Sequence, residues 1–261
     1  MSHPPGIHPT AIIDPKAQLG DQVRIGPYSV IGPDVVIGDG CDIGSHVVID
    51  GRTTLGSGNR IFPHNAIGLA PQDLKFKDEP SRLEIGDNNT FREFMTVHIG
   101  TEGGGMLTRI GSDNLFMAYV HIAHDCIIGS GCILANAVTL AGHVTVGDRA
   151  VIGGITPVHQ FNRIGEGAMV GGGSVVTEDI SPYCLAVGNR AVLRGLNLVG
   201  LKRQGLNREQ IRILKQAYAM IFDGDQPVRE AAEKAKSTWP DDPRIEILTQ
   251  FITGSDRGVC S

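Results

Sequence analysis

Aromatic residues are scarce in this chain of 261 residues: they make up 5% of the sequence, and tryptophan occurs once. This disfavours a wide core built from large rings and favours a narrow interior filled by aliphatic side chains. No stretch reaches the roughly 18 consecutive apolar residues that a membrane-spanning helix needs, and the N-terminal residues lack the apolar run of a signal peptide. We therefore expect no transmembrane segment and a cytoplasmic location.

Paired cysteine motifs are also missing. The five cysteines are an odd number and show no C-x-x-C spacing, which argues against a disulfide framework and against a zinc knuckle. Reduced thiols fit a cytoplasmic protein best. No Ser or Cys lies in a nucleophile-elbow motif, so a covalent acyl-enzyme is not predicted, and Cys126 is interpreted as a small buried thiol.

Charge is divided unevenly along the chain. Residues 1–189 carry 11 basic and 19 acidic side chains, a net −8, whereas residues 190–261 carry 12 and 9, a net +3. A basic C-terminal segment can dock an acidic partner, although such charges also occur on the solvated face of ordinary helices. No nucleic-acid partner is expected.

A six-residue repeat dominates most of the sequence. Aliphatic or Phe anchors recur at this spacing, and a glycine often follows directly, which suits sharp corners. The anchors are Ile7, Ile13, Leu19, Ile25, Ile31, Ile37, Ile43, Ile49, Leu55, Ile61, Ile67, Ile85, Phe91, Val97, Ile110, Phe116, Ile122, Ile128, Leu134, Leu140, Val146, Ile152, Val158, Ile164, Val170 and Val176.

Hexads of this kind predict a parallel β-helix, in which short strands turn a corner every six residues and stack on the coil below. Three hexads close one coil, so residues 18 apart lie above each other at roughly the 4.8 Å spacing of paired strands. Asp125 and His143 have this separation. Because such solenoids often assemble side by side, we expect a homo-oligomer with ligand sites between subunits.

Two segments interrupt the repeat, at 69–84 and 98–109. We expect them to be inserted loops, which in repeat folds commonly gather on one binding face and here would wall a cleft near His124. The β-helix is predicted to occupy residues 1–189, and a helical C-terminal domain residues 190–261.

Four helices are expected in the C-terminal domain. Asn207 and Gln210 form a capping-box pattern before an apolar-periodic run, which predicts a helix starting there. The other helices are expected around residues 193–204, 227–238 and 243–251.

The chemistry is expected in the stretch from His121 to His143, where three histidines and an aspartate break an otherwise small, aliphatic pattern. A neutral histidine can accept a proton from an attacking hydroxyl, and we assign this role to His124. Asp125 can hold the imidazole tautomer, and the Gly142 N–H can approach a developing oxyanion. From the residues alone, His121, His143 and His159 remain open as ligand contacts, metal ligands or corner residues.

Several longer motifs add a resemblance. The hexads, Q-D-L-K at Gln72, H-I-A-H-D-C at His121, L-A-G-H at Leu140, V-H-Q-F at Val158 and N-L-V-G-L-K-R at Asn197 together resemble the UDP-N-acetylglucosamine 3-O-acyltransferase family over nearly the whole chain. The resemblance implies a left-handed β-helix, a helical C-terminal domain and a homotrimer. It also implies transfer of an (R)-3-hydroxyacyl group from acyl carrier protein to the 3-hydroxyl of UDP-N-acetylglucosamine, the first step of lipid A biosynthesis.

The same resemblance implies site residues. His124 is the general base with Asp125 beside it, Gly142 is the oxyanion donor, and no cofactor or metal is required. Gly172 resembles the position that limits the acyl channel and implies room for a long chain, whereas Val199 and Gln204 depart from the family pattern. The residues implied to line the substrate sites are Asp73, Lys75, His98, His121, His143, His159, Gln160, Gly172, Asn197 and Arg203.

Three alternatives stay open at this point. A zinc-dependent hydratase of the γ-carbonic anhydrase type could bind zinc between subunits, with His121 and His124 of one chain and His143 of its neighbour as ligands. The N-acyltransferase of the same pathway is disfavoured because it carries an additional N-terminal domain, whereas the coils here begin at Ile7. A hexapeptide scaffold without catalysis is the third alternative.

Overall fold

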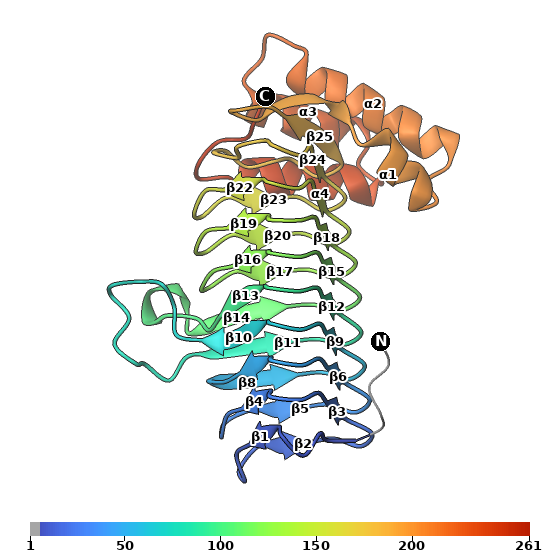
Figure 1. Ribbon diagram of the computed structural model, residues 1–261. Coiled ribbons are helices and arrows are strands. Elements are labelled where there is room, and N and C mark those ends of the chain that lie inside the picture. Colours follow the sequence, from blue (N-terminus) through green and yellow to red (C-terminus); the bar gives the residue numbers. More distant parts are fainter. Residues whose placement is uncertain (1–5) are drawn as a thin grey trace.

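The computed structural model describes residues 6–261 and shows a triangular solenoid capped at one end by helices (Figure 1). Its short strands form three sheets, named here after their first strand. In the β1 and β2 sheets every pairing is parallel. None of the helices within residues 6–261 combines the length and apolar character needed to cross a membrane.

The strands of each sheet follow one another up the solenoid. The β1 sheet contains β1 (Ile12–Ile13), β4 (Val30–Ile31), β7 (Val48–Ile49), β10 (Ala66–Leu69), β13 (Thr96–His98), β16 (His121–Ile122), β19 (Thr139–Leu140) and β22 (Pro157–Val158). The β2 sheet contains β2 (Gln18–Leu19), β5 (Val36–Ile37), β8 (Arg52–Leu55), β11 (Arg82–Ile85), β14 (Leu107–Ile110), β17 (Ile127–Ile128), β20 (Thr145–Val146) and β23 (Arg163–Ile164). The β3 sheet contains β3 (Arg24–Ile25), β6 (Asp42–Ile43), β9 (Arg60–Ile61), β12 (Thr90–Phe91), β15 (Leu115–Phe116), β18 (Ile133–Leu134), β21 (Val151–Ile152), β24 (Met169–Val170), β25 (Cys184–Val187) and β26 (Val192–Leu196).

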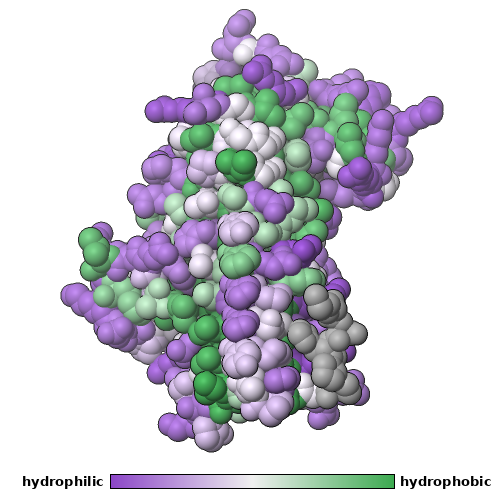
Figure 2. Space-filling view, in the orientation of Figure 1, coloured by the Kyte–Doolittle hydropathy of each residue, from purple (hydrophilic) through white to green (hydrophobic). Residues whose placement is uncertain are grey.

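The hexad anchors fill the interior, as the period predicts. Nearly all of them are buried, and away from the two insertions each lies above the anchor 18 residues earlier, as Ile31 lies above Ile13. The first three anchors, at the open end of the solenoid, are exposed or half-buried because fewer coils cover them. The residues that alternate with the anchors along each strand point outward. On the outer face seen in Figure 2, hydrophobic and hydrophilic residues are intermixed.

Both insertions emerge from the same corner, between the β1 and β2 sheets. The first joins β10 to β11. It increases the sequence separation of residues paired between neighbouring coils from 18 to 30 positions, as in Ala66 and Thr96. The second joins β13 to β14 with a separation of 25, and it contains the 3₁₀ helix η1 (Glu102–Gly104). Both loops are shorter than expected, because residues 82–84 and 107–109 already pair within the β2 sheet.

The solenoid ends differently from the sequence expectation. A helix was predicted over 193–204, but β26 occupies most of its first half and pairs antiparallel with β25, and α1 (Leu198–Arg203) follows. Gly195 has φ +117°, which an α-helix does not tolerate, and the open end of the β3 sheet offers backbone groups for pairing.

The other predicted helices are confirmed. They are α2 (Arg208–Phe222), α3 (Val228–Thr238) and α4 (Pro243–Thr253), and α2 begins with the expected capping box of Asn207 and Gln210. Their buried faces form a second hydrophobic cluster beside the last coils. Asp179 connects the two parts by accepting hydrogen bonds from Arg163 Nε at 2.8 Å and Ser255 Oγ at 2.9 Å.

Candidate active site

The histidine-rich stretch lies on the corner from which both insertions emerge. His124 and Asp125 turn the chain from β16 into β17, Gly142 and His143 do the same one coil further on, and Gln160 follows on the next coil. The inserted loops extend from the earlier coils of this corner (Figure 1). The expected cleft walls and the expected base are therefore neighbours.

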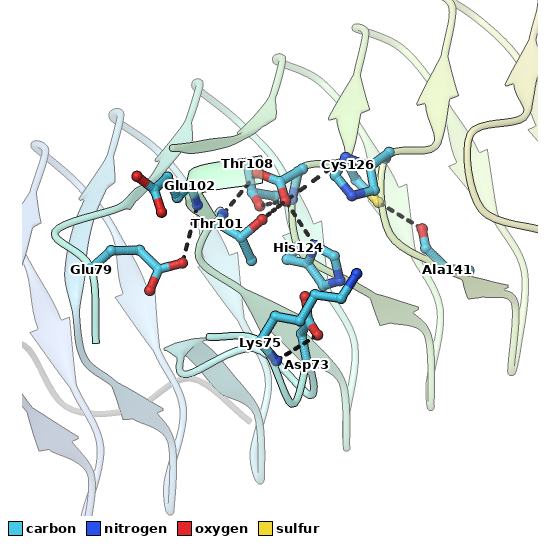
Figure 3. Close-up of polar contacts among 11 residues, drawn as sticks. Asp73, Lys75, Glu79, Thr101, Glu102, Thr108, His124, Cys126 and Ala141 are labelled. Atoms are coloured by element: carbon cyan, nitrogen blue, oxygen red, sulfur yellow. Dashed lines mark hydrogen bonds and ion pairs between the residues drawn. The ribbon is translucent and has the colours of Figure 1, made fainter. Parts of the chain in front are cut away.

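His124 and Asp125 form a hydrogen-bonded pair. His124 Nδ1 lies 2.7 Å from Asp125 Oδ2, and the Asp125 side chain is 1% exposed (Figure 3). An ionised carboxylate only accepts hydrogen bonds, so Nδ1 carries the proton and Nε2 keeps its lone pair. This is the arrangement of a general base with its orienting acid.

Asp125 has further partners that sequence analysis missed. Its Oδ1 accepts from the Thr101 backbone N–H at 2.8 Å, and its Oδ2 accepts from Thr101 Oγ1 at 2.6 Å. The Asp125 N–H donates to Thr108 Oγ1 at 2.8 Å. Both threonines belong to the second insertion and the strand after it, so their distance from Asp125 in the sequence concealed the contact.

Gly142 packs directly against the His124 ring. A Cβ at this position would lie 2.5 Å from His124 Cε1 and 2.7 Å from Nε2. Cβ atoms in proteins essentially never come this close to a non-bonded atom. Among the hydrogen bonds within residues 6–261, the Gly142 N–H takes part in none. The same turn position is proline at residues 27, 33 and 63, which shows that the turn does not require this N–H. The amide is therefore free to bind an oxygen beside His124.

His143 stacks between coils on the same corner. Its ring lies 4.3 Å from that of Phe161, and its Nδ1 is 3.9 Å from Asp125 Oδ2. This confirms the predicted stacking of residues 18 apart. Burial lowers the pKa of His143, a shift that Asp125 and Asp73 oppose.

His98 and His121 form a second pair at the end of β13 and the start of β16. Their rings meet edge to face at 5.2 Å, and His121 Nδ1 lies 2.7 Å from Thr96 Oγ1. Burial, and then the neighbouring His121 and His124, lowers the pKa of His98 to about 4. The His98 ring is therefore neutral near pH 7, and its buried Nδ1 has no partner among the described residues.

Asp73 and Lys75 extend from the first insertion toward His124 (Figure 3). The Lys75 backbone N–H donates to Asp73 Oδ1 at 2.9 Å, which closes a tight turn. The Lys75 side chain, with its ammonium group, is exposed. Leu74 between them is fully exposed.

Three predicted residues do not join this cluster within one chain. Gly172 lies at the corner between the β3 and β1 sheets. Asn197 caps α1 by accepting from the Gly200 N–H and donating to the Gly167 carbonyl, both at 3.0 Å, beside the corner between the β2 and β3 sheets. Arg203 is the last residue of α1, which lies on the opposite side of the solenoid from the insertions (Figure 1). His159, in contrast, lies on the His124 corner next to Gln160.

Cys126 behaves as the buried thiol that the sequence predicts. It donates to the Ala141 carbonyl with an S···O distance of 3.2 Å, and burial raises its pKa to about 12. A thiol with such a pKa is a poor nucleophile near neutral pH.

Among the residues that the structure describes, one group of side chains could hold a metal ion. His124, Asp125 and His143 can each place one ligand atom within 4.8 Å of the others. The set differs from the His121, His124 and His143 ligands of the hydratase alternative. Asp125 Oδ2, which lies 2.7 Å from His124 Nδ1 and 3.9 Å from His143 Nδ1, already accepts from His124 and Thr101.

Comparison with known proteins distinguishes the alternatives. Residues 179–260 match the family described as "Udp N-acetylglucosamine O-acyltransferase; Domain 2", and residues 16–51 and 107–142 match "Bacterial transferase hexapeptide (six repeats)". The chain is 52% identical to the acyl-[acyl-carrier-protein]–UDP-N-acetylglucosamine O-acyltransferase of Aliarcobacter butzleri, covering 97% of both chains. It is 53% identical to the protein of the same name from Sulfurovum sp., covering 97% of this chain and 96% of the relative.

Solved structures give the same result. LpxA from Acinetobacter baumannii superposes with a TM-score of 0.95 at 43% identity, covering 98% of this chain and 99% of that one. The UDP-N-acetylglucosamine acyltransferase from Campylobacter jejuni gives a TM-score of 0.93 at 41% identity, with the same coverage. The predicted left-handed β-helix with a helical C-terminal part is thereby confirmed, and neither the hydratase nor the scaffold alternative is favoured. The chain belongs to the family of acyl-[acyl-carrier-protein]–UDP-N-acetylglucosamine O-acyltransferases.

Proposed function

We propose that this protein transfers an (R)-3-hydroxyacyl chain from acyl carrier protein to the 3-hydroxyl of UDP-N-acetylglucosamine, the first step of lipid A biosynthesis. The observation that carries the proposal is the His124–Asp125 pair, whose Nε2 lone pair lies beside an unpaired backbone N–H. Membership of the acyltransferase family gives the chemical class of both substrates.

The base acts on the attacking hydroxyl. The sugar hydroxyl donates to His124 Nε2 and loses its proton there as its oxygen attacks the thioester carbonyl carbon. Asp125 stabilises the imidazolium that forms, since its Oδ2 lies 2.7 Å from Nδ1. When the tetrahedral intermediate collapses, the C–S bond breaks and the imidazolium returns the proton to the departing thiolate.

The Gly142 N–H stabilises the intermediate. Its donor is unpaired and lies beside the base, where the former carbonyl oxygen becomes negative. A fixed backbone donor needs no reorganisation as this charge develops.

The substrates lie along the same corner. The exposed ammonium of Lys75 suits the diphosphate, and the neutral rings of His98 and His121 suit uncharged hydroxyl or amide groups. Asp73, His143, His159 and Gln160 complete this part of the proposed substrate site.

The remaining substrate contacts require a second copy of the chain. Gly172, Asn197 and Arg203 lie at other corners or on another side of the solenoid, too far around it to face the same ligand as His124. A cyclic trimer brings different corners of neighbouring solenoids together, so the proposed homotrimer places Arg203 of one chain near His124 of the next. Asn197 contributes through the α1 terminus that it caps, because its side-chain amide is already engaged.

Two finer features belong to this proposal. Gly172 lacks a side chain at an exposed corner, which supports a long acyl chain, and comparison of ten- and fourteen-carbon donors tests this preference. The basic C-terminal segment suits an acidic carrier protein, and five unpaired, buried cysteines suit a reducing cytoplasm.

Turnover in the presence of a chelator tests the proposal. UDP-N-acetylglucosamine and 3-hydroxyacyl carrier protein are supplied to the native chain, to His124→Ala and to His8→Ala, a half-buried control histidine at the far end of the solenoid. We expect product from the native chain and the control, and a loss of roughly 10² to 10⁴ in kcat for His124→Ala. Binding of UDP-N-acetylglucosamine should largely survive. No product with any donor, or full activity of His124→Ala, would contradict the proposal.

A further inference from the structure

The Asp125 carboxylate has two histidine neighbours but forms a hydrogen bond with only one. His124 Nδ1 lies 2.7 Å from Oδ2, and His143 Nδ1 lies 3.9 Å from the same oxygen. A modest rotation of the carboxylate could exchange these partners. Something must therefore hold the carboxylate turned toward the base.

Thr101 fixes both carboxylate oxygens at once. Its backbone N–H donates to Oδ1 at 2.8 Å and its hydroxyl to Oδ2 at 2.6 Å, so rotation of the carboxylate breaks two charge-assisted hydrogen bonds. Thr101 stands at the N-cap of η1, where a threonine hydroxyl usually caps the helix, yet its side chain makes no cap hydrogen bond. The hydroxyl is used for Asp125 instead of for the local structure.

Gly104 closes the other side of the carboxylate. A Cβ on Gly104 would lie 1.9 Å from Asp125 Cγ and 2.3 Å from each oxygen, so only glycine can approach so closely. Its φ lies outside the positive region, so alanine would fit the backbone but not the space. Gly103 in the same 3₁₀ helix has nothing within 4 Å of an added Cβ.

The second insertion is also connected to the first. Glu79 Oε1 accepts from the Glu102 backbone N–H at 3.0 Å (Figure 3). Glu79 Oε2 accepts from the Lys77 backbone N–H at 2.7 Å. These backbone donors lower the pKa of Glu79. The loop that carries Asp73 and Lys75 thus supports the residue that follows Thr101.

We infer that Thr101 and Gly104 are positioning residues that lock Asp125 onto His124 and away from His143, and thereby select which histidine serves as the base. The inference rests on the proposed role of His124. It assigns a catalytic purpose to the second insertion, beyond that of a wall of the substrate cleft.

Paired substitutions test the two contacts. Thr101→Val removes the hydroxyl at nearly constant shape, and Thr101→Ser restores it, whereas Gly104→Ala intrudes on the carboxylate and Gly103→Ala is its matched control. We expect Thr101→Val and Gly104→Ala to lower kcat by roughly 10- to 100-fold, the effect of losing one hydrogen bond to a charged group. KM for UDP-N-acetylglucosamine should stay within about threefold, because neither residue touches the proposed substrate site. Thr101→Ser and Gly103→Ala should turn over like the native chain.

If the second insertion had only a structural role, other results would follow. Thr101→Val and Gly104→Ala would then lower the melting temperature or raise KM while leaving kcat of the folded enzyme intact. If Thr101→Val and Gly104→Ala keep native kcat while His124→Ala is inactive, the positioning inference is wrong and the base assignment stands. If His124→Ala is itself fully active, the base assignment is wrong and the inference falls with it.

Discussion

Replacing Gly142 by alanine tests the geometry of the base without removing any polar group. The new methyl group would lie 2.5 Å from His124 Cε1 and 2.7 Å from Nε2, whereas carbon atoms in contact are normally separated by about 3.5–4.0 Å. The imidazole, or the turn that carries Gly142, must therefore retreat by about 1 Å. The methyl also meets Nε2 itself, the atom proposed to accept the proton.

A misplacement of about 1 Å at a reacting group can cost roughly 100-fold in rate, so we expect kcat of Gly142→Ala to fall by about two orders of magnitude. Overpacking should cost about 1–3 kcal/mol of the free energy of unfolding, which leaves a folded protein. The assay is steady-state turnover with saturating substrates, accompanied by thermal unfolding. Gly103→Ala serves as the control, because its added Cβ meets nothing within 4 Å.

A double-mutant cycle separates this effect from general damage. In a His124→Ala background the added methyl has no ring to displace, so Gly142→Ala should then cost little further activity. Native kcat in the single variant would refute the close-packing argument. A full additional loss in the double variant would show that Gly142→Ala acts through its own N–H or through the backbone.

Two further predictions concern the protonation of His98 and the composition of the site. The pKa of His98 is lowered from 6.5 to about 4, so the unfolded chain binds more protons than the folded chain between these pH values. The free energy of unfolding should therefore fall by roughly 2 kcal/mol from pH 7 to pH 5. Urea titration should show a smaller fall in His98→Asn. An equally steep pH dependence in the variant would show that other groups cause it. If His124 and Arg203 of different chains form one site, mixed trimers of the inactive His124→Ala and Arg203→Ala chains, refolded together in equal amounts, should regain about one quarter of native activity. No regain would place both residues in a site within one chain.

Much of the architecture could be predicted because its determinants are local and repeated. The six-residue period fixes which side chains point inward, and Ile122, Ile128 and Leu134 are all buried as it predicts. The capping pattern of Asn207 and Gln210 likewise sufficed to locate the start of α2. The His124–Asp125 pair could also be predicted, because the two residues are adjacent in the chain.

Other parts could not be predicted because they depend on contacts between distant segments. β26 forms where a helix was expected, since the end of a sheet offers pairing that local propensity does not show. Thr101 reaches Asp125 across 24 residues of sequence, and only the fold brings the second insertion over the carboxylate. The three consecutive glycines of that insertion were the available signal, because glycine allows close approach as well as flexibility.

The sequence by itself determined the coil, its core and the histidine corner, and it predicted the pairing of His124 with Asp125. The period, the residue types and their adjacency contain that information. Only the tertiary structure decided that Thr101 of the second insertion reaches the Asp125 carboxylate, and that Gly142 and Gly104 pack against His124 and Asp125. It also separated Asn197 and Arg203 from the histidine corner. These are properties of stacking in three dimensions, where a few ångströms decide contact and positions far apart in the chain become neighbours.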